Sequence, residues 1–111
     1  MIGSITKLWF EKYADSGLEQ LMDFCGTYNI VKELQDAVRL AEVCFEKKKS
    51  TVRLKIQDDP STDDVHVVIC VSTCEKSRLK VLANYRAYQR RMMHTVSHQA
   101  SSLIRFSFDM I

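Results

Sequence analysis

The segment that decides the fold is EKSRLKVLANYRAYQRRMMHTVSHQASSL, residues 75–103. At about 100° per residue, its side chains fall into two sectors of different character. One sector is apolar and comprises Val81, Leu82, Tyr85, Tyr88, Met92, Met93, Val96, Ala100 and Leu103. The other is basic and comprises Lys76, Lys80, Arg86, Arg90, Arg91, His94 and His98. An apolar stripe of this width packs against a core, so the pattern predicts one long amphipathic helix over residues 75–103.

Two strands with different patterns precede this helix. From Thr51 onward, apolar Val52, Leu54 and Ile56 alternate with polar Arg53, Lys55 and Gln57, which predicts a strand with one wet face. Residues 58–64 form a polar turn. Residues 65–72 are apolar on both faces, and a strand of this kind is usually interior to a sheet.

An interior strand needs a neighbour on each side, and a hairpin supplies only one. Residues 104–110 offer the second, because Ile104, Phe106, Phe108 and Met110 alternate with Arg105, Ser107 and Asp109. Paired with residues 65–72, this strand would run parallel after a right-handed crossover. Alternatively, the long helix continues to the end of this stretch and a second copy supplies the missing strand, which gives a four-stranded sheet across a dimer.

Helical patterns fill the first half of the chain. Ser4 is a candidate cap for a first short helix, and Ser16 with Glu19 forms a capping box for a second that Gly26 closes. A third helix follows Asn29, with an inward face of Ile30, Leu34, Ala37, Val38, Ala41 and Phe45. Ser72 and Glu75 form a second capping box at the start of the long helix. We therefore expect residues 1–111 to form a single α+β domain, with N-terminal helices, a β-hairpin and a long C-terminal helix packed on a small sheet.

Charge is distributed unevenly along the chain. The net charge of +2 divides into −4 over residues 1–75 and +6 over residues 76–111, and no acidic residue occurs from 76 to 108. Such a separation of charge attracts an acidic partner, or the opposite charges pair with each other across a dimer.

No apolar run reaches the roughly 20 residues of a membrane span, and no signal peptide is recognisable. We expect a cytoplasmic, reducing location with Cys25, Cys44, Cys70 and Cys74 as free thiols.

No catalytic motif is present in the sequence. Its three glycines do not form a phosphate-binding loop, and no serine occupies a nucleophile elbow. A metal site from Cys70, Cys74, His94 and His98 is disfavoured, because a helix starting near Cys74 carries His94 about 30 Å away. The four aspartates in residues 58–64 lack the glycine and spacing of a calcium loop. We therefore expect no cofactor, no metal and no identifiable small-molecule substrate.

These observations favour a small, non-enzymatic protein–protein interaction or regulatory module that self-associates or joins a complex. The first alternative is a nucleic-acid-binding protein that uses the basic sector of the helix. The second is a thiol-dependent or metal-dependent protein that uses Cys70 and Cys74. For the thiol alternative, Cys74 is predicted in the first helical turn beside Lys76 and Arg78, where positive charge favours a thiolate.

Overall fold

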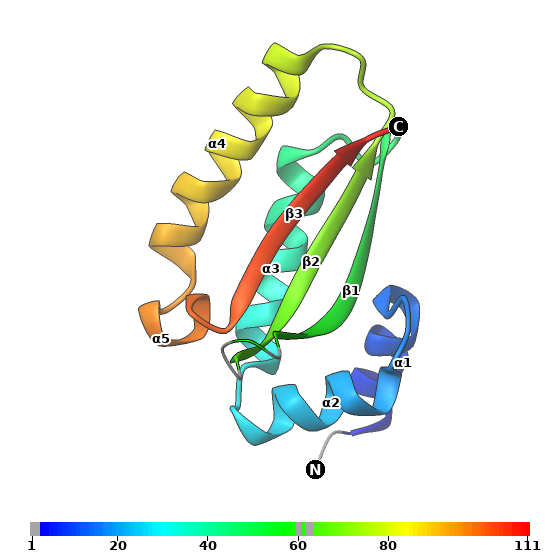
Figure 1. The fold of residues 1–111 in the computed structure, drawn as a ribbon, viewed down its shortest axis with the longest axis vertical. Helices are drawn as coiled ribbons and strands as arrows, with labels where there is room; N and C mark the ends of the chain where they lie inside the picture. The colour runs from blue at the N-terminus through cyan, green and yellow to red at the C-terminus, as the bar shows by residue number, and fades with distance from the viewer. Residues whose placement is uncertain (1–2, 60, 62–63) are drawn as a thin grey trace.

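A computed structural model describes residues 3–59, 61 and 64–111 and has an α+β fold (Figure 1). The helices are α1 (Ser4–Tyr13), α2 (Leu18–Thr27), α3 (Val31–Cys44), α4 (Arg78–Thr95) and α5 (His98–Ser101). The strands are β1 (Ser50–Asp59), β2 (Asp64–Thr73) and β3 (Ile104–Met110). None of the helices in the described part of the chain combines the length and apolar character needed to cross a bilayer.

The three strands form one sheet in the order β1-β2-β3. β1 pairs with β2 in antiparallel register, with Leu54 opposite Ile69, and β3 pairs with β2 in parallel register, with Phe106 also opposite Ile69. The prediction that residues 65–72 are interior to a sheet is confirmed, as is the third C-terminal strand. The alternative, in which the helix continues through residues 104–110, is wrong.

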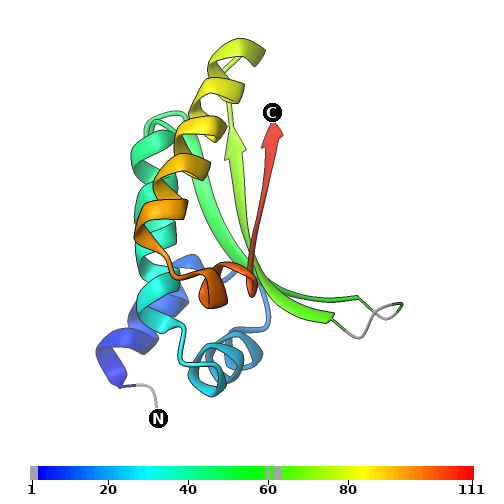
Figure 2. The same ribbon diagram turned by 90° about the vertical axis from the view of Figure 1, so that its left-hand side faces the viewer.

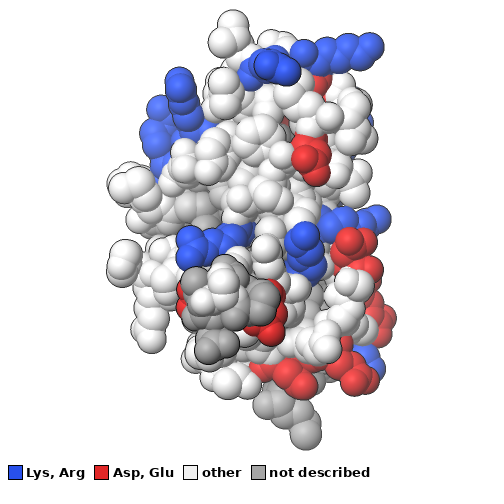
Figure 3. All heavy atoms as spheres, in the orientation of Figure 1, with Lys and Arg blue, Asp and Glu red and all other residues white. Residues whose placement is uncertain are grey.

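Helices cover only one face of the sheet (Figure 2). α3 and α4 lie together on this face, and α1 and α2 lie at one end of the molecule. The opposite face is open, and Figure 3 shows lysine and arginine side chains across its middle. The register places Lys55, Val68 and Arg105 in one row on that face, with Lys55 and Arg105 exposed. The predicted wet face of β1 is therefore confirmed.

The core lies between α3, α4 and the covered face of the sheet. All six side chains predicted to form the inward face of the third helix are buried. Phe45, at the end of α3, stacks on Phe106 of β3 with ring centroids 5.6 Å apart. The ring of Phe106 also lies 5.4 Å from that of Tyr85 and 4.4 Å from that of Tyr88. This aromatic cluster attaches α4 and β3 to the rest of the domain.

The first helices begin and end at residues other than those predicted. Gly3 and Gly17, rather than Ser4 and Ser16, precede α1 and α2. Gly17 has φ +65°, a left-handed conformation that glycine adopts without strain. Asn29, predicted to cap the third helix, instead has φ +55° just beyond α2, and a left-handed Asn is a common residue after a helix end.

The single helix predicted over residues 75–103 is wrong, because the segment forms two helices. α4 ends at Thr95, Val96 is buried in an extended conformation, and α5 begins at His98. Ser97 caps α5, since its hydroxyl oxygen accepts a hydrogen bond of 3.1 Å from the backbone N–H of Ala100. The predicted apolar sector is also partly wrong, because Leu82 is 42% exposed and Met93 is 80% exposed.

Candidate protein-binding groove

A groove of about 610 Å³ lies between α4 and β3. Its walls are mainly apolar and aromatic, and its lining residues are Tyr85, Arg86, Tyr88, Gln89, Arg90, Met92, Met93, Ser101, Ile104 and Phe106. Tyr88 and Ile104 are buried and Phe106 is half-buried, whereas Arg86, Gln89, Arg90 and Met93 are exposed. The groove therefore has an apolar floor and a rim that carries two cations. We call these residues the α4–β3 groove.

The two arginines on the rim have no acidic neighbour to neutralise them. Arg86 and Arg90 form no ion pair with any side chain in the described ranges 3–59, 61 and 64–111. The stretch that contributes α4 and α5 contains no carboxylate side chain at all between residues 76 and 108. The rim is therefore a positively charged border around apolar surface.

One edge of β3 adjoins this groove and has no neighbouring strand in the described part of the sheet. On the β2 side, the carbonyl oxygen of Leu103 accepts from Val67 N–H at 2.9 Å, and Ile111 N–H donates to the carbonyl oxygen of Thr73 at 2.8 Å. Because successive residues of a strand direct their backbone groups to opposite edges, odd-numbered residues face β2. The N–H and C=O groups of Ile104, Phe106, Phe108 and Met110 therefore point to the free edge. Figure 2 looks toward this edge and shows no strand alongside it.

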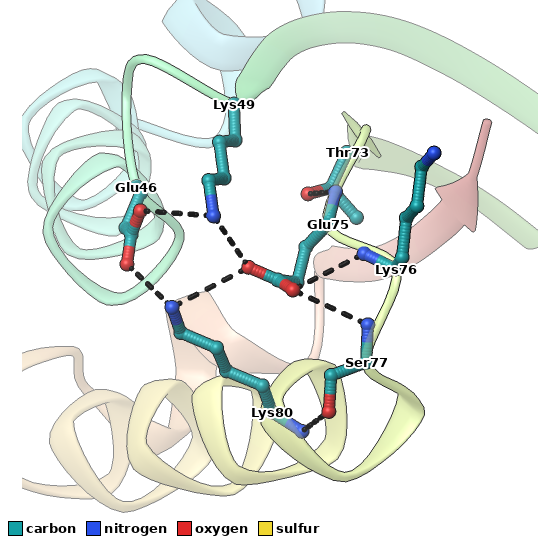
Figure 4. A network of polar contacts seen from close by, with 7 residues as sticks. All are labelled: Glu46, Lys49, Thr73, Glu75, Lys76, Ser77 and Lys80. Atoms are coloured by element: carbon teal, nitrogen blue, oxygen red, sulfur yellow. Dashed lines mark hydrogen bonds and ion pairs between the residues drawn. The ribbon is translucent and has the colours of Figure 1, made fainter.

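An ion-pair network that includes Lys80 holds the first turn of α4 (Figure 4). Nζ of Lys49 lies 2.9 Å from Oε2 of Glu75, and Nζ of Lys80 lies 2.9 Å from Oε1 of Glu46 and 3.4 Å from Oε2 of Glu75. Glu75 also accepts hydrogen bonds from the backbone N–H groups of Lys76 and Ser77. The network links the end of α3 to the start of α4.

These contacts change the proton affinities of the network. The hydrogen bond from Lys49, followed by that from the Ser77 backbone, lowers the pKa of Glu75 to about 2. Hydrogen bonding to Glu46, and then to Glu75, raises the pKa of Lys80. Both residues are therefore charged at neutral pH, and Lys80 is already paired within the molecule.

The structure divides the seven residues of the predicted basic sector among different places. Lys76 precedes α4, Lys80 joins the ion-pair network and His98 lies on α5. Arg86 and Arg90 lie on the rim of the α4–β3 groove. A second depression, beside Leu40 of α3, is lined by Arg90, Arg91 and His94. The structure therefore brings four of the seven residues together along α4, namely Arg86, Arg90, Arg91 and His94.

The placement of Cys74 in a first helical turn is wrong. The strand β2 extends to Thr73, α4 is capped by Ser77 through its hydroxyl, and Cys74 is exposed in the connection between them. Cys70 lies on the open face of β2, opposite Arg53 on one side and Ser107 on the other. In the parts of the chain that the structure describes, no cluster of three or more His, Cys, Asp or Glu side chains is arranged to hold a metal.

Sequence reasoning missed that Tyr88, Met92, Ile104 and Phe106 line a groove, because periodicity identifies apolar faces but not gaps between elements. The alternation in residues 104–110 was the sequence signal that could have indicated this site, because the outermost strand of a sheet has one edge without a neighbouring strand.

Comparison of the chain with protein-family models, curated proteins and solved structures gives no match.

Proposed function

We propose that this chain is a non-enzymatic protein–protein interaction module that binds a segment of another protein in the α4–β3 groove. The observation that carries the proposal is the free edge of β3 beside an apolar groove with a cationic rim. Natural proteins usually protect the edge strands of their sheets by charge, bulges or covering elements. Here the backbone groups of four residues and the half-buried ring of Phe106 are left open on one side.

A segment of a different protein fits this site better than symmetric pairing with a second copy. Antiparallel pairing of two β3 strands about Ser107 would match Arg105 of each with Asp109 of the other. However, α3 runs behind β3, and α4 lies beyond β3 on the side away from β2 (Figure 1). A second copy paired in this way would bring its own α3 into the space between α3 and α4. A single extended or helical segment of another protein has no such second helix and avoids this overlap.

The test compares two substitutions on α4 that differ in position alone. Met93 lines the groove and is 80% exposed, whereas Leu79 is 81% exposed and is not among the groove residues. Met93→Glu and Leu79→Glu therefore introduce the same charge at equally exposed helical sites, and neither removes a buried side chain. The proteins are immobilised and incubated with nuclease-treated lysate of the native host, and retained proteins are quantified by mass spectrometry.

We expect a defined protein to be retained by the wild type and by the Leu79→Glu variant, and to be reduced about tenfold with Met93→Glu, because a negative charge at the rim disrupts an apolar contact. Equal retention by all three proteins would contradict the assignment of the groove. Sedimentation equilibrium on the same proteins distinguishes the second copy as partner: a dimer abolished by Met93→Glu alone would place another copy of the chain in the groove.

Nucleic-acid binding by α4 is the second candidate function. It is supported by the exposure of Arg86, Arg90, Arg91 and His94 along one helix. Because Lys80 is paired with Glu46 and Glu75, Arg86, Arg90 and Arg91 are the cations of the predicted basic sector that remain available on α4 for phosphates. If all three bind phosphates of duplex DNA, log affinity should fall with log salt concentration with a slope of about −2.7.

Charge reversal tests this candidate. The triple variant R86E/R90E/R91E should abolish binding of a fluorescent duplex measured by anisotropy, while its circular dichroism spectrum remains that of the wild type. The matched control R39E reverses a charge on α3 whose only described ion pair is with neighbouring Asp36. Affinity that is indifferent to salt, or lost equally with R39E, would reject nucleic-acid binding by α4.

A further inference from the structure

We infer that the bound segment is an acidic, extended peptide that pairs with the free edge of β3 as a fourth strand. The inference rests on the proposed function and specifies how the α4–β3 groove is used. It assigns the backbone of β3 to affinity, the groove to apolar side chains of the peptide, and Arg105 to its carboxylates.

The backbone of β3 is arranged to accept a strand. Ile104, Phe106, Phe108 and Met110 each direct one N–H and one C=O group to the free edge, as the hydrogen bonds of Leu103 and Ile111 to β2 require. An added strand pairs with these groups, and such main-chain bonding gives affinity that does not depend on the peptide sequence. The seven residues of β3 accommodate a segment of similar length.

The covered side of the added strand would face apolar surface. Side chains of successive strand residues point to opposite faces, so every second side chain of the peptide would point to the side where α4 lies. There the side chains of Tyr88, Met92 and Phe106 line the groove. Apolar side chains at alternate positions therefore match this surface, and charged ones at those positions would be desolvated without a partner.

The charges around this edge favour carboxylates in the peptide. Arg105 is exposed on the open face of β3, and Arg86 and Arg90 are exposed on the rim formed by α4. Asp109 is the only acidic residue after position 75. The peptide side chains that alternate with the apolar ones would lie on the open face, beside Arg105. Complementary charge on a partner raises its association rate and excludes basic competitors.

The first experiment uses capped synthetic peptides and isothermal titration calorimetry. The probe is acetyl-Glu-Val-Glu-Val-Glu-Val-Glu-amide, and the control has lysine in place of every glutamate. We expect the acidic probe to bind about tenfold or more tightly than the basic control, and Arg105→Glu to weaken the acidic probe by a similar factor. Arg53→Glu is the matched variant, since Arg53 is exposed on the same sheet face but on the far strand β1, and it should leave affinity within about twofold.

The second experiment identifies the binding mode by NMR amide exchange. On saturation with the acidic probe, the amides of Ile104, Phe106, Phe108 and Met110 should exchange at least about tenfold more slowly, whereas those of Arg105, Ser107 and Asp109, already bonded to β2, should change little. Probes that are N-methylated at every second residue add an independent test. Methylation of one alternate set should abolish binding, and methylation of the other set should preserve it, because only one edge of the peptide faces β3.

Each outcome bears on the inference in a defined way. Slower exchange confined to the even-numbered amides, with one sensitive methylation set, supports strand addition. Absence of binding by the acidic probe, equal protection of odd and even amides, or equal sensitivity of both methylation sets overturns it. If the Met93→Glu variant still loses its partner in the lysate experiment while strand addition fails, the groove binds protein in another mode. If Met93→Glu retains its partner, the proposed function itself fails.

Discussion

Lys49 and Glu75 are joined by a 2.9 Å contact between Nζ and Oε2, although 26 residues separate them along the chain. Lys49 follows α3 and Glu75 precedes α4 (Figure 4), and the two helices lie on the covered face of the sheet (Figure 2). The Glu75 side chain is only 14% exposed. This ion pair therefore fixes the two helices at the end where β2 leaves the sheet.

The network predicts how stability depends on pH. The pKa of Glu75 falls from an ordinary 4.5 to about 2 in the folded protein, chiefly because Lys49 hydrogen-bonds to its carboxylate. Because the folded pKa is lower, the stabilisation is complete above about pH 4.5 and is lost as the pH falls toward 2. Glu75→Gln should lower the melting temperature at pH 7 and have a progressively smaller effect below pH 4.5. Thermal unfolding followed by circular dichroism from pH 7 to pH 2.5 measures this, with Glu11→Gln on the exposed side of α1 as the control.

The aromatic cluster predicts that Phe106 is important for stability. Its ring packs against those of Phe45, Tyr85 and Tyr88. Because Phe106 is half-buried, Phe106→Ala should lower the free energy of unfolding by about 2 to 3 kcal/mol, less than for a fully buried phenylalanine. Urea denaturation checks this. Met93→Ala, on the exposed rim of the same groove, should change the free energy by less than about 0.5 kcal/mol, and a larger effect would mean that Met93 also packs on the core.

The hydroxyl groups of two tyrosines should differ in their effect on stability. The Tyr13 hydroxyl donates to the Glu42 carboxylate at 3.0 Å, whereas the Tyr88 hydroxyl has no hydrogen-bond partner among the described protein groups. Tyr13→Phe should therefore lower the free energy of unfolding by about 1 kcal/mol, and Tyr88→Phe should leave it unchanged or raise it. Paired urea titrations decide between these outcomes. An equal loss from both substitutions would show that the Tyr88 hydroxyl is stabilised in the folded protein.

The thiols should differ widely in reactivity. Cys74 is exposed, whereas Cys25 is 0% exposed and burial raises its pKa to about 12. Ellman's reagent at neutral pH should modify Cys74 in the folded protein and leave Cys25 unmodified until the protein unfolds. Peptide mass spectrometry after timed quenching identifies which thiol has reacted. Modification of Cys25 before Cys74 would contradict the packing of α2.

Hydrophobic periodicity predicted the main elements of the fold correctly. The interior character of residues 65–72 required two neighbouring strands, and the alternation in residues 104–110 identified the second of them. The inward face of α3 could be predicted because the side chains from Leu34 to Ala41 recur at regular helical spacing. Both patterns follow from burial on one side of a regular element.

The helix break and the groove could not be predicted in the same way. Val96 maintains the apolar period through the break, because it is buried in an extended conformation as it would be in a helix. Ser97 was the available signal, since serine is a preferred N-cap. The exposure of Met93 depends on how far α4 stands from β3, and the pairing of Lys80 with Glu46 depends on how the end of α3 lies against the start of α4. Those are relationships between elements far apart in sequence.

The parallel pairing of β3 with β2 has a consequence for synthesis on the ribosome. The 30 residues between Thr73 and Ile104 must emerge before the central strand obtains its second neighbour. Until then β2, which is apolar on both faces, would present one unpaired edge to solvent or to a chaperone. Pairings of long sequence separation form slowly and expose aggregation-prone intermediates, so we expect the yield of native protein to depend on how quickly translation proceeds through α4.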